Sequence, residues 1–296
     1  MASNLPEGPA ISVVVPSYNP DARLFARLYH SLCEQTYASF EVIVVDDASP
    51  SADYALLQDK RFRLLRLEKN AGPAAARNAG AAAARAPVLF FTDTDCELAP
   101  DCLAAMADAI ASESILVGDT RTRVETAFGR AVALLGFPGG GALGFDRVWR
   151  VDAHGYTRSF SSCNLAFRRE CFEALGRFNE DFPVAGGEDT VLARKAADAG
   201  IRIRYVPGQV VYHVEKSSLR DFLRWQIVRG RGNYHIHRHV PEVGGYLRLR
   251  VWTYANSMRA AGLLYALPVT LLWVLSMLYQ TLGYRLEQRR IPSDKA

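Results

Sequence analysis

Two acidic side chains, Asp93 and Asp95, stand one residue apart directly after an apolar run at residues 88–91. A short apolar run of this kind predicts a buried strand, and acids at its carboxyl end lie where open α/β sheets bind ligands. Two carboxylates there supply hard oxygen ligands for a divalent cation that holds phosphates. The alternative is a strand followed by a polar turn whose acids only cap the next helix. This stretch alone leaves both interpretations open.

Strand-like and helix-like patterns alternate in the first part of the chain. Apolar, β-branched runs at residues 11–15 and 40–45 predict two buried strands, and residues 63–67 predict a weaker third strand. Leucines four residues apart within residues 21–35 predict a helix between the first two strands. Strand, helix and strand in this order predict parallel pairing with right-handed crossovers, and therefore an α/β fold.

An alanine-rich stretch at residues 70–80 opens with a Gly-Pro turn and predicts another helix. Alanine is the best helix former and allows close packing on a sheet. The N-terminal amides of this helix are placed to face an anion, and Arg77 lies on its second turn. A small-residue packing helix is the alternative, but it leaves Arg77 and its neighbour Asn78 unexplained.

The part of the chain between residues 120 and 160 shows no clear periodicity. Pro138 and the three glycines at residues 139–141 argue for a mobile loop or lid, and no helix or strand is assigned there. Further on, two separate strands are predicted at residues 201–207 and 209–214, of which the second carries His213.

A helix is predicted at residues 188–199, directly behind Gly186 and Gly187. Its first turn carries Glu188 and Asp189, whose negative charges suit the positive end of the helix dipole. The two glycines place this acidic turn in a flexible bend. An acidic pair that serves only the helix dipole is the alternative to a catalytic role.

At 296 residues the chain is long enough for one large domain or two. Its apolar fraction of 49% and charged fraction of 22% are those of a globular protein. A net charge of +4 is too small to favour nucleic acid as the main partner. Five cysteines without a CxxC pair indicate reduced thiols in a cytosolic setting, and the N-terminal residues lack the pattern of a signal peptide.

The composition changes after Val214. Between that residue and Arg259 there are nine Lys or Arg residues and three acids. Residues 218–227 predict a basic amphipathic helix, at whose start Ser218 and Asp221 resemble a capping box. Such helices are common at membrane surfaces, although an ordinary surface helix packed on the core explains the pattern equally well.

Residues 260–284 contain no charged side chain. As one helix they would be about 37 Å long, against about 30 Å for the hydrocarbon core of a bilayer. Arg259 and Arg285 bracket the stretch, and Pro268 is a position for a kink or a division into two interfacial pieces. We expect membrane insertion, as one span or as a shallow hairpin, and a buried core helix is the alternative.

Six motifs taken together resemble the family 2 glycosyltransferases, which have the GT-A fold. In chain order they are VVVPSYN, FEVIVVDDAS, NAGPAAARNAG, FTDTD, GGEDTVLARKAADAG and VVYH. Each is weak alone, but six in this order at family-like spacing form a strong signal over residues 11–214. The resemblance implies a Rossmann-like, mixed but mostly parallel sheet flanked by helices. With the C-terminal membrane-associated helical tail, it predicts a catalytic domain at 1–215, a basic amphipathic juxtamembrane region at 216–259 and an apolar membrane segment with a basic end at 260–296.

The resemblance also implies roles for the matching residues. Tyr18 would stack on the nucleotide base, and Asp46 or Asp47 would hydrogen-bond the base or its ribose. Arg77 would lie near the base and the diphosphate. The residues implied on the donor side are Pro16, Tyr18, Asp46, Asp47, Arg77, Asp93 and Asp95.

For the metal, the resemblance implies Asp95 as the direct ligand of the DxD motif, with Asp93 nearby and His213 completing the site. Mixed oxygen and imidazole ligation favours Mn²⁺ over Ca²⁺, and Mg²⁺ is the alternative. For His213 itself, a core histidine is the alternative. Asp189 would be the catalytic base. The residues implied on the acceptor side are Glu188, Gly187 and Asn164, although Asn164 also suits an ordinary turn.

The reaction implied is transfer of a hexose-type sugar with inversion at the anomeric carbon. The departing nucleoside diphosphate needs a divalent cation to neutralise its charge, and the acceptor hydroxyl needs a carboxylate to take its proton. The transition state is oxocarbenium-like, as in glycoside hydrolysis. No second, nucleophilic carboxylate stands out, which favours direct attack and inversion.

We therefore expect a membrane-associated enzyme with its catalytic domain on the cytoplasmic face. Its partners would be a nucleotide-diphosphate sugar, a glycan or lipid-linked acceptor and the membrane, but no nucleic acid. A sugar-nucleotidyltransferase is one alternative, yet such enzymes usually carry a glycine-rich basic loop that PSYNPDARL lacks. A non-catalytic membrane-bound protein of the same fold is another, against which Asp95, Asp189 and His213 argue.

Overall fold

The computed structural model describes residues 8–182, 186–240 and 244–291. In chain order the helices and strands are β1 (Ile11–Ser17), α1 (Ala22–Cys33), β2 (Phe40–Asp46), β3 (Phe62–Arg66), α2 (Pro73–Ala83), β4 (Val88–Phe91), β5 (Cys96–Leu98), α3 (Cys102–Ile110), β6 (Ile115–Arg123), α4 (Ala127–Ala133), α5 (Phe145–Val148), β7 (Tyr156–Thr157), the 3₁₀ helix η1 (Ser162–Asn164), β8 (Leu165–Arg168), α6 (Arg169–Ala174), α7 (Glu188–Asp198), β9 (Ile203–Val214), α8 (Leu219–His239) and α9 (Gly244–Arg290).

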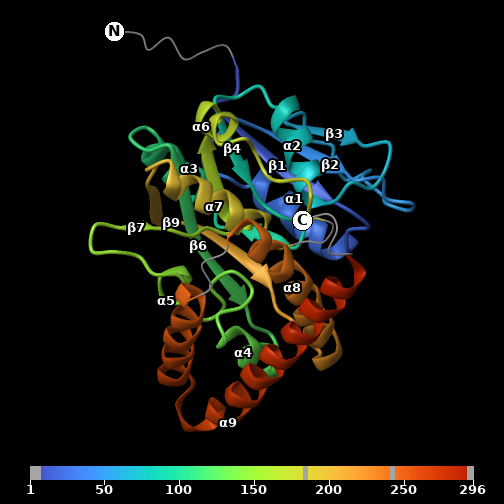
Figure 1. Ribbon diagram of the computed structural model, residues 1–296. Coiled ribbons are helices and arrows are strands. Elements are labelled where there is room, and N and C mark those ends of the chain that lie inside the picture. The colour runs from blue at the N-terminus through green and yellow to red at the C-terminus, as the bar shows by residue number, and fades with distance from the viewer. Residues whose placement is uncertain (1–7, 183–185, 241–243, 292–296) are drawn as a thin grey trace.

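The strands join into one mixed sheet with helices on both faces (Figure 1). The strand order is β3-β2-β1-β4-β8-β6-β9-β5, and β7 pairs with β9. The four strands from β3 to β4 are parallel to one another, whereas β8 is antiparallel to both β4 and β6. Strands β6 and β9 are again parallel. The prediction of a mixed, mostly parallel sheet flanked by helices is therefore confirmed.

Each face of the sheet has its own apolar core. Helices α1 and α3 pack on one face, where Phe25 and Met106 are buried. Helices α2, α6 and α7 cover the other face, where Phe172 and Leu192 are buried. Helix α2 lies very close to the sheet because a side chain at Gly80 would collide with Val14. The small residues of this helix therefore do have the packing role that their composition predicted.

Strand β1 extends beyond its predicted end at residue 15. It continues through Pro16 to Ser17, in parallel register with β2 as far as Asp46. The proline is tolerated because the other neighbour, β4, pairs with β1 only up to Val14.

The two strands predicted at residues 201–207 and 209–214 are a single strand, β9. Its pairing with β6 shifts register between Gly118 and Asp119. The register shift accommodates Pro207 and Gly208, which in the sequence had indicated the end of a strand. The prediction of two separate strands was therefore wrong.

Residues 120–160 contain more helix and strand than their sequence pattern indicated. The end of β6, helices α4 and α5 and strand β7 occupy this region, and the peptide bond before Pro138 is cis. Gly140 and Gly141 are buried, and a side chain at Gly141 would lie 2.1 Å from the carbonyl oxygen of Ala133. These glycines permit close packing of the segment against α4.

The tail consists of α8 and the bent helix α9. The hydroxyl of Ser218 accepts the backbone N–H of Asp221 at 3.1 Å, so the predicted cap of α8 is confirmed. Helix α9 breaks at Gly262 (φ 58°, ψ −172°), ahead of Pro268, because glycine readily adopts positive φ. Its two halves form a V that projects from the end of the molecule (Figure 1).

One helix of the described residues, Arg248–Arg290, is long and apolar enough to cross a membrane. Only 22% of its most apolar window is buried within the protein. A core helix of a soluble protein would be mostly buried. This exposure argues against a buried core helix as the explanation of the uncharged segment.

Candidate active site

The register of the short strand β5 brings Asp95 to His213. Cys96, the first residue of β5, pairs with His213 of β9 in antiparallel register. The backbone N–H of Val214 donates to the carbonyl oxygen of Asp95 at 3.1 Å. The Asp95 carboxylate therefore lies beside the imidazole, with 3.4 Å between its Oδ1 and His213 Nε2.

The imidazole of His213 is held as a metal ligand requires. Its Nδ1 lies 3.0 Å from the carbonyl oxygen of Val214, to which it donates in the neutral tautomer. In that tautomer Nε2 can bind a cation placed between it and Asp95, and such a hydrogen bond on the far nitrogen is the usual support of a ligating histidine. One oxygen and one imidazole nitrogen at this spacing fit a divalent cation such as Mn²⁺ or Mg²⁺.

Arg77 connects the turn after β4 to the start of α7. Its Nη2 lies 2.7 Å from Asp93 Oδ1, and its Nη1 lies 2.9 Å from Glu188 Oε1. Burial acts to lower the pKa of Arg77, but the charges of Asp93 and Glu188 outweigh it and hold that pKa above its ordinary value. Residues of three motifs thus meet at one buried cation. Asp93 faces Arg77, while Asp95 faces His213.

The bend before α7 depends on two glycines. Gly186 and Gly187 have φ of 107° and 116°, values that other residues rarely adopt. A side chain at Gly187 would also lie 2.8 Å from both Ile236 and Phe182. Helix α8 approaches the same bend, because a side chain at Gly232 would lie 2.2 Å from the carbonyl oxygen of Gly186.

The two acids in the first turn of α7 have different surroundings. Glu188 is buried, and its oxygens accept from Arg77 at 2.9 Å and from the backbone N–H of Gly186 at 3.0 Å. Asp189 accepts the backbone N–H and the hydroxyl of its neighbour Thr190, at 2.7 and 3.4 Å. A backbone N–H of Ser162 and the charge of Arg229 also act on it, and it lines a cavity. Asp189 is therefore the carboxylate of the pair that a bound molecule can reach.

The environment of this pair raises both carboxyl pKa values. Burial raises the pKa of Asp189, and the Thr190 N–H and the Arg77 charge offset part of that rise. Burial also raises the pKa of Glu188, the charge of Asp189 adds to the effect, and Arg77 opposes it. A raised pKa gives Asp189 more basicity than an exposed aspartate has, which suits proton transfer.

The acids at the end of β2 are fully engaged by the protein. Asp46 forms an ion pair with Arg66 at 2.8 Å and accepts the backbone N–H of Ser49 at 3.0 Å. Asp47 accepts the N–H groups of residues 71 and 72, each at 2.8 Å. Both side chains are almost completely buried. They hold the loop before α2 and the turn after β2 in place.

Three other predicted residues have contrasting positions. Tyr18 is 52% exposed directly after β1, where its ring can receive a flat partner. Pro16 is the second-to-last residue of the same strand. Asn164 is completely buried, and its amide donates to the carbonyl oxygen of Gln209 at 2.9 Å and accepts from the side chain of Gln209 at 2.8 Å. Asn164 therefore braces η1 against β9 instead of facing an acceptor.

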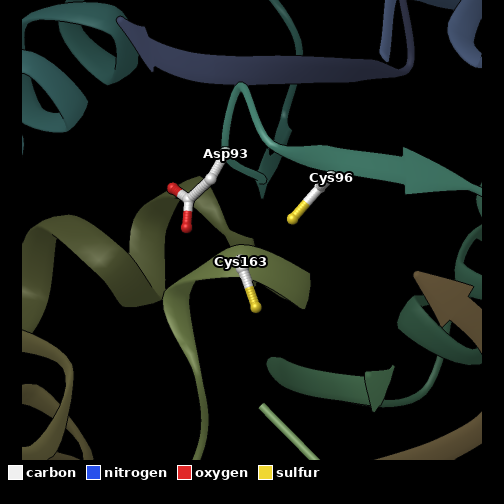
Figure 2. Close-up of side chains that lie close together, drawn as sticks. All are labelled: Asp93, Cys96 and Cys163. Carbon is white, nitrogen blue, oxygen red and sulfur yellow. The ribbon is translucent and has the colours of Figure 1, made fainter. Parts of the chain in front are cut away.

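Asp93, Cys96 and Cys163 lie close together next to this site (Figure 2). The contact with Cys163 and burial raise the pKa of the Cys96 thiol well above its ordinary value. Cys96 also lies within reach of Asp95 and His213. Two thiols favour soft metals, whereas a carboxylate and an imidazole suit Mn²⁺ or Mg²⁺ better, so Asp95 and His213 are the better position for such a cation.

The cavity beside Asp189 is lined mainly by residues that the sequence analysis did not assign. Its aromatic wall comes from the region 120–160, and its other wall comes from α8. The residues on these walls are Phe137, Trp149, Phe160, Arg229, Asn233 and Ile236. The last three share one face of α8, since they are spaced four and three residues apart. That spacing is visible in the sequence, but it does not tell which partner the face meets.

Residues 12–176, more than half of the chain, match the family described as Glycosyl transferase family 2. The chain is 29% identical over 230 residues to the succinoglycan biosynthesis protein ExoO of Rhizobium meliloti (strain 1021), which covers 73% of this chain and 64% of that protein. It is 28% identical over 280 residues to an N-acetylglucosaminyltransferase of Bradyrhizobium diazoefficiens, which covers 82% of this chain and 53% of that protein. The chain thus spans less than two thirds of the length of these relatives.

A similar solved structure is the mannosyltransferase PcManGT from Pyrobaculum calidifontis, in complex with GDP-Man and Mn²⁺. The TM-score is 0.63 at 22% identity, over 98% of this chain and 88% of that one. At this level of identity the likeness shows the fold alone, and it confirms the GT-A fold. With the family match over residues 12–176, it shows that this chain belongs to the family 2 glycosyltransferases.

Proposed function

We propose that this protein transfers a hexose-type sugar, with inversion, from a nucleotide-diphosphate sugar to a hydroxyl of a glycan or lipid-linked acceptor at a membrane. The observation that carries this proposal is the buried Arg77, which contacts Asp93 on one side and Glu188 on the other. It joins the turn that holds the donor phosphates to the helix that carries the base. The catalytic domain would comprise residues 1–215 and lie on the cytoplasmic face.

On the donor side, Asp95 and His213 would hold Mn²⁺ or Mg²⁺, with Asp93 close by. When bound, the cation would supply positive charge to the leaving diphosphate. Tyr18 would stack on the base. Asp46, Asp47 and Pro16 would contribute by positioning the loops around the nucleotide, since their side chains are already engaged or lie within a strand. The Mn²⁺ in the mannosyltransferase structure supports this cation.

On the acceptor side, Asp189 would take the proton of the attacking hydroxyl. The acceptor oxygen then bonds to the anomeric carbon as the bond from that carbon to the diphosphate oxygen breaks, and the electron pair leaves with the diphosphate. Glu188 would stay bound to Arg77 and keep the turn in place, and Gly187 would allow the bend. No second carboxylate of the described cavity wall is placed to form a covalent sugar intermediate, so the anomeric centre inverts.

The acceptor would occupy the cavity beside Asp189. Aromatic side chains such as Phe137 and Trp149 present the flat apolar surfaces on which sugar rings pack. A relative named for succinoglycan biosynthesis supports a glycan acceptor. The basic region 216–259 and the apolar segment 260–296 would hold the protein at the membrane.

The test is product analysis with purified full-length protein. A panel of UDP- and GDP-linked sugars with Mn²⁺ is offered with glycan and lipid-diphosphate-linked acceptors, and the anomeric configuration of the product is read by NMR. We expect a glycoside of configuration opposite to that of the donor. Retention of configuration would refute the inverting mechanism. Formation of a nucleotide sugar from a sugar phosphate would indicate a nucleotidyltransferase instead.

A further inference from the structure

The second half of α9, residues 263–290, presents one exposed apolar stripe. From Leu264 onward its members recur every three or four residues, which places them on one face of the helix. The exposed fractions range from 44% to 100%, and the members are Leu263, Leu264, Leu267, Leu271, Val274, Leu278, Leu282 and Leu286. Scattered single leucines are normal on a protein surface, but a contiguous row of this length marks an interaction surface.

The opposite face of the same helix half is fixed to α8 at close range. A side chain at Gly230 would lie 2.1 Å from the carbonyl oxygen of Gln280, and one at Gly283 would lie 2.1 Å from that of Ile227. The Gln280 amide bonds to Gln226 at 2.5 Å inside this contact. The helix therefore cannot rotate to hide its leucines without separating from α8.

Charged side chains also lie along this fixed face. Glu287 is buried between Arg231 at 2.6 Å and His235 at 3.1 Å. Inside the uncharged stretch, the buried guanidinium of Arg250 donates to Gln280 Oε1 at 2.6 Å. A helix that crossed a bilayer would draw these groups toward the hydrocarbon, and charged groups there are costly.

Exposed arginines stand at both ends of the leucine stripe. Arg259 precedes it, Arg285 lies beside its last leucine, and Arg289 and Arg290 follow it. Between residues 244 and 291 the only acid is Glu287, which is buried in its ion pairs. An apolar stripe between cationic ends is complementary to a bilayer surface, with acyl chains below and phosphates around them.

From these contacts we infer that residues 263–290 lie in the plane of one leaflet, with the leucine stripe among the acyl chains and the arginines at anionic headgroups. The inference rests on the membrane attachment that is part of the proposed function. Of the two arrangements expected from the sequence, a transmembrane span and a shallow hairpin at the membrane surface, it selects the surface hairpin. A second copy of the chain fits less well. If the leucine stripes of two copies packed together, parallel or antiparallel, arginines of one copy would lie against arginines of the other, and like charges repel.

The first test is flotation of the full-length protein with phosphatidylcholine vesicles, with and without phosphatidylglycerol. We expect binding that increases with phosphatidylglycerol, and a loss of at least about tenfold in partitioning for Leu271→Glu. Leu64→Glu is the matched control, because Leu64 is a comparably exposed leucine on β3, at 48% against 56%. Binding that Leu271→Glu leaves unchanged, or that both variants reduce equally, would overturn the inference.

The second test measures depth. Leu264→Trp, Leu271→Trp and Leu278→Trp are each mixed with vesicles whose lipids carry bromine at a shallow or a deep acyl position. An in-plane helix gives strongest quenching by the same shallow bromine for all three. Strongest quenching by the deep bromine at position 271 alone would indicate a span. Dimers that form without lipid and that Leu271→Glu dissociates would indicate a second copy. Either result overturns the inference.

Sugar transfer to a soluble acceptor is followed in parallel to separate the two proposals. Normal transfer without vesicle binding would refute only the surface hairpin. Vesicle binding without transfer from any donor would refute only the proposed function.

Discussion

Two acidic pairs in this protein look alike in sequence and differ in their surroundings. At the end of β2, Asp46 and Asp47 both have their carboxylates occupied by protein donors. At the start of α7, Glu188 is occupied in the same way, while Asp189 faces a cavity. An acid at a strand or helix end is therefore not a ligand-binding group by position alone. What decides its use is whether the fold already satisfies its oxygens.

The turn after β4 resembles the start of α7, with one acid occupied by the protein and one open. Asp93 is occupied by Arg77, and Asp95 faces His213. In both pairs, one acid contacts Arg77 and its companion does not. Substitution of each acid should therefore separate the acids that hold the turns from those proposed to contact the substrates.

The largest effect is expected for Asp189→Asn. The amide keeps the shape of the side chain but cannot take a proton, so the transfer rate should fall by about 10² to 10⁴. Donor and metal binding should stay close to wild type, and Glu188→Gln should lower the rate less. Single-turnover kinetics with Asp198→Asn, at the far end of the same helix, as control would measure this. Near-normal turnover of Asp189→Asn would refute the role, and an equal loss of donor affinity would assign Asp189 to the donor site.

A smaller effect is expected for Asp95→Ala, and it should appear in binding. Loss of the direct ligand should reduce the Mn²⁺-dependent affinity for a nucleoside diphosphate by at least about tenfold to a hundredfold. Calorimetry with and without Mn²⁺ measures this, and Glu97→Ala is a control on the adjacent strand β5. If Mn²⁺ still strengthened binding to the same extent in Asp95→Ala, another residue would be the ligand.

The pH dependence should reflect the raised pKa of Asp189. The base works only when it is deprotonated, so kcat/KM should fall as the pH drops through that pKa. Because burial raises the pKa, the acid limb should lie above the ordinary aspartate value of about 3.9. The limb should be absent from the residual activity of Asp189→Asn. An unchanged limb in that variant would mean that another group titrates.

The smallest effect on activity is expected for Asp47→Asn. One oxygen that accepts a backbone N–H becomes an NH₂ group, so the free energy of unfolding should fall by about 1–3 kcal/mol. Mn²⁺-dependent affinity for the diphosphate should change little, because the carboxylate holds the loop at residues 71 and 72. Urea unfolding and calorimetry on the same preparation would compare the two quantities. A large loss of affinity at unchanged stability would show direct contact with the nucleotide.

Sequence patterns predicted the parallel half of the sheet well, because buried strands and amphipathic helices have clear periodicities. They failed where glycine or proline had a tertiary role. The glycines at residues 139–141 read as a mobile loop, yet they permit close packing. The helix break lies at Gly262 and not at Pro268, and β9 passes through its Pro-Gly pair by a register shift.

The candidate site was predictable to the extent that its residues belong to motifs. Asp95, His213, Arg77 and Asp189 were all named from the sequence, and the structure places them around one edge of the sheet. The partners of each acid were not predictable, because nothing in the sequence pairs Arg66 with Asp46, or Arg77 with Asp93 and Glu188. The wall that α8 contributes to the cavity was missed because it depends on how the tail folds back.

The close approach of Gly232 to the carbonyl oxygen of Gly186 affects how this protein can be engineered. A chain cut at residue 215 would keep every motif residue, but it would lose the helix that supports the bend before Asp189. A foreign membrane anchor fused at that point would leave the bend unsupported, unless it also packed a glycine against this carbonyl. The catalytic domain proposed at residues 1–215 therefore depends on α8 for the shape of this bend.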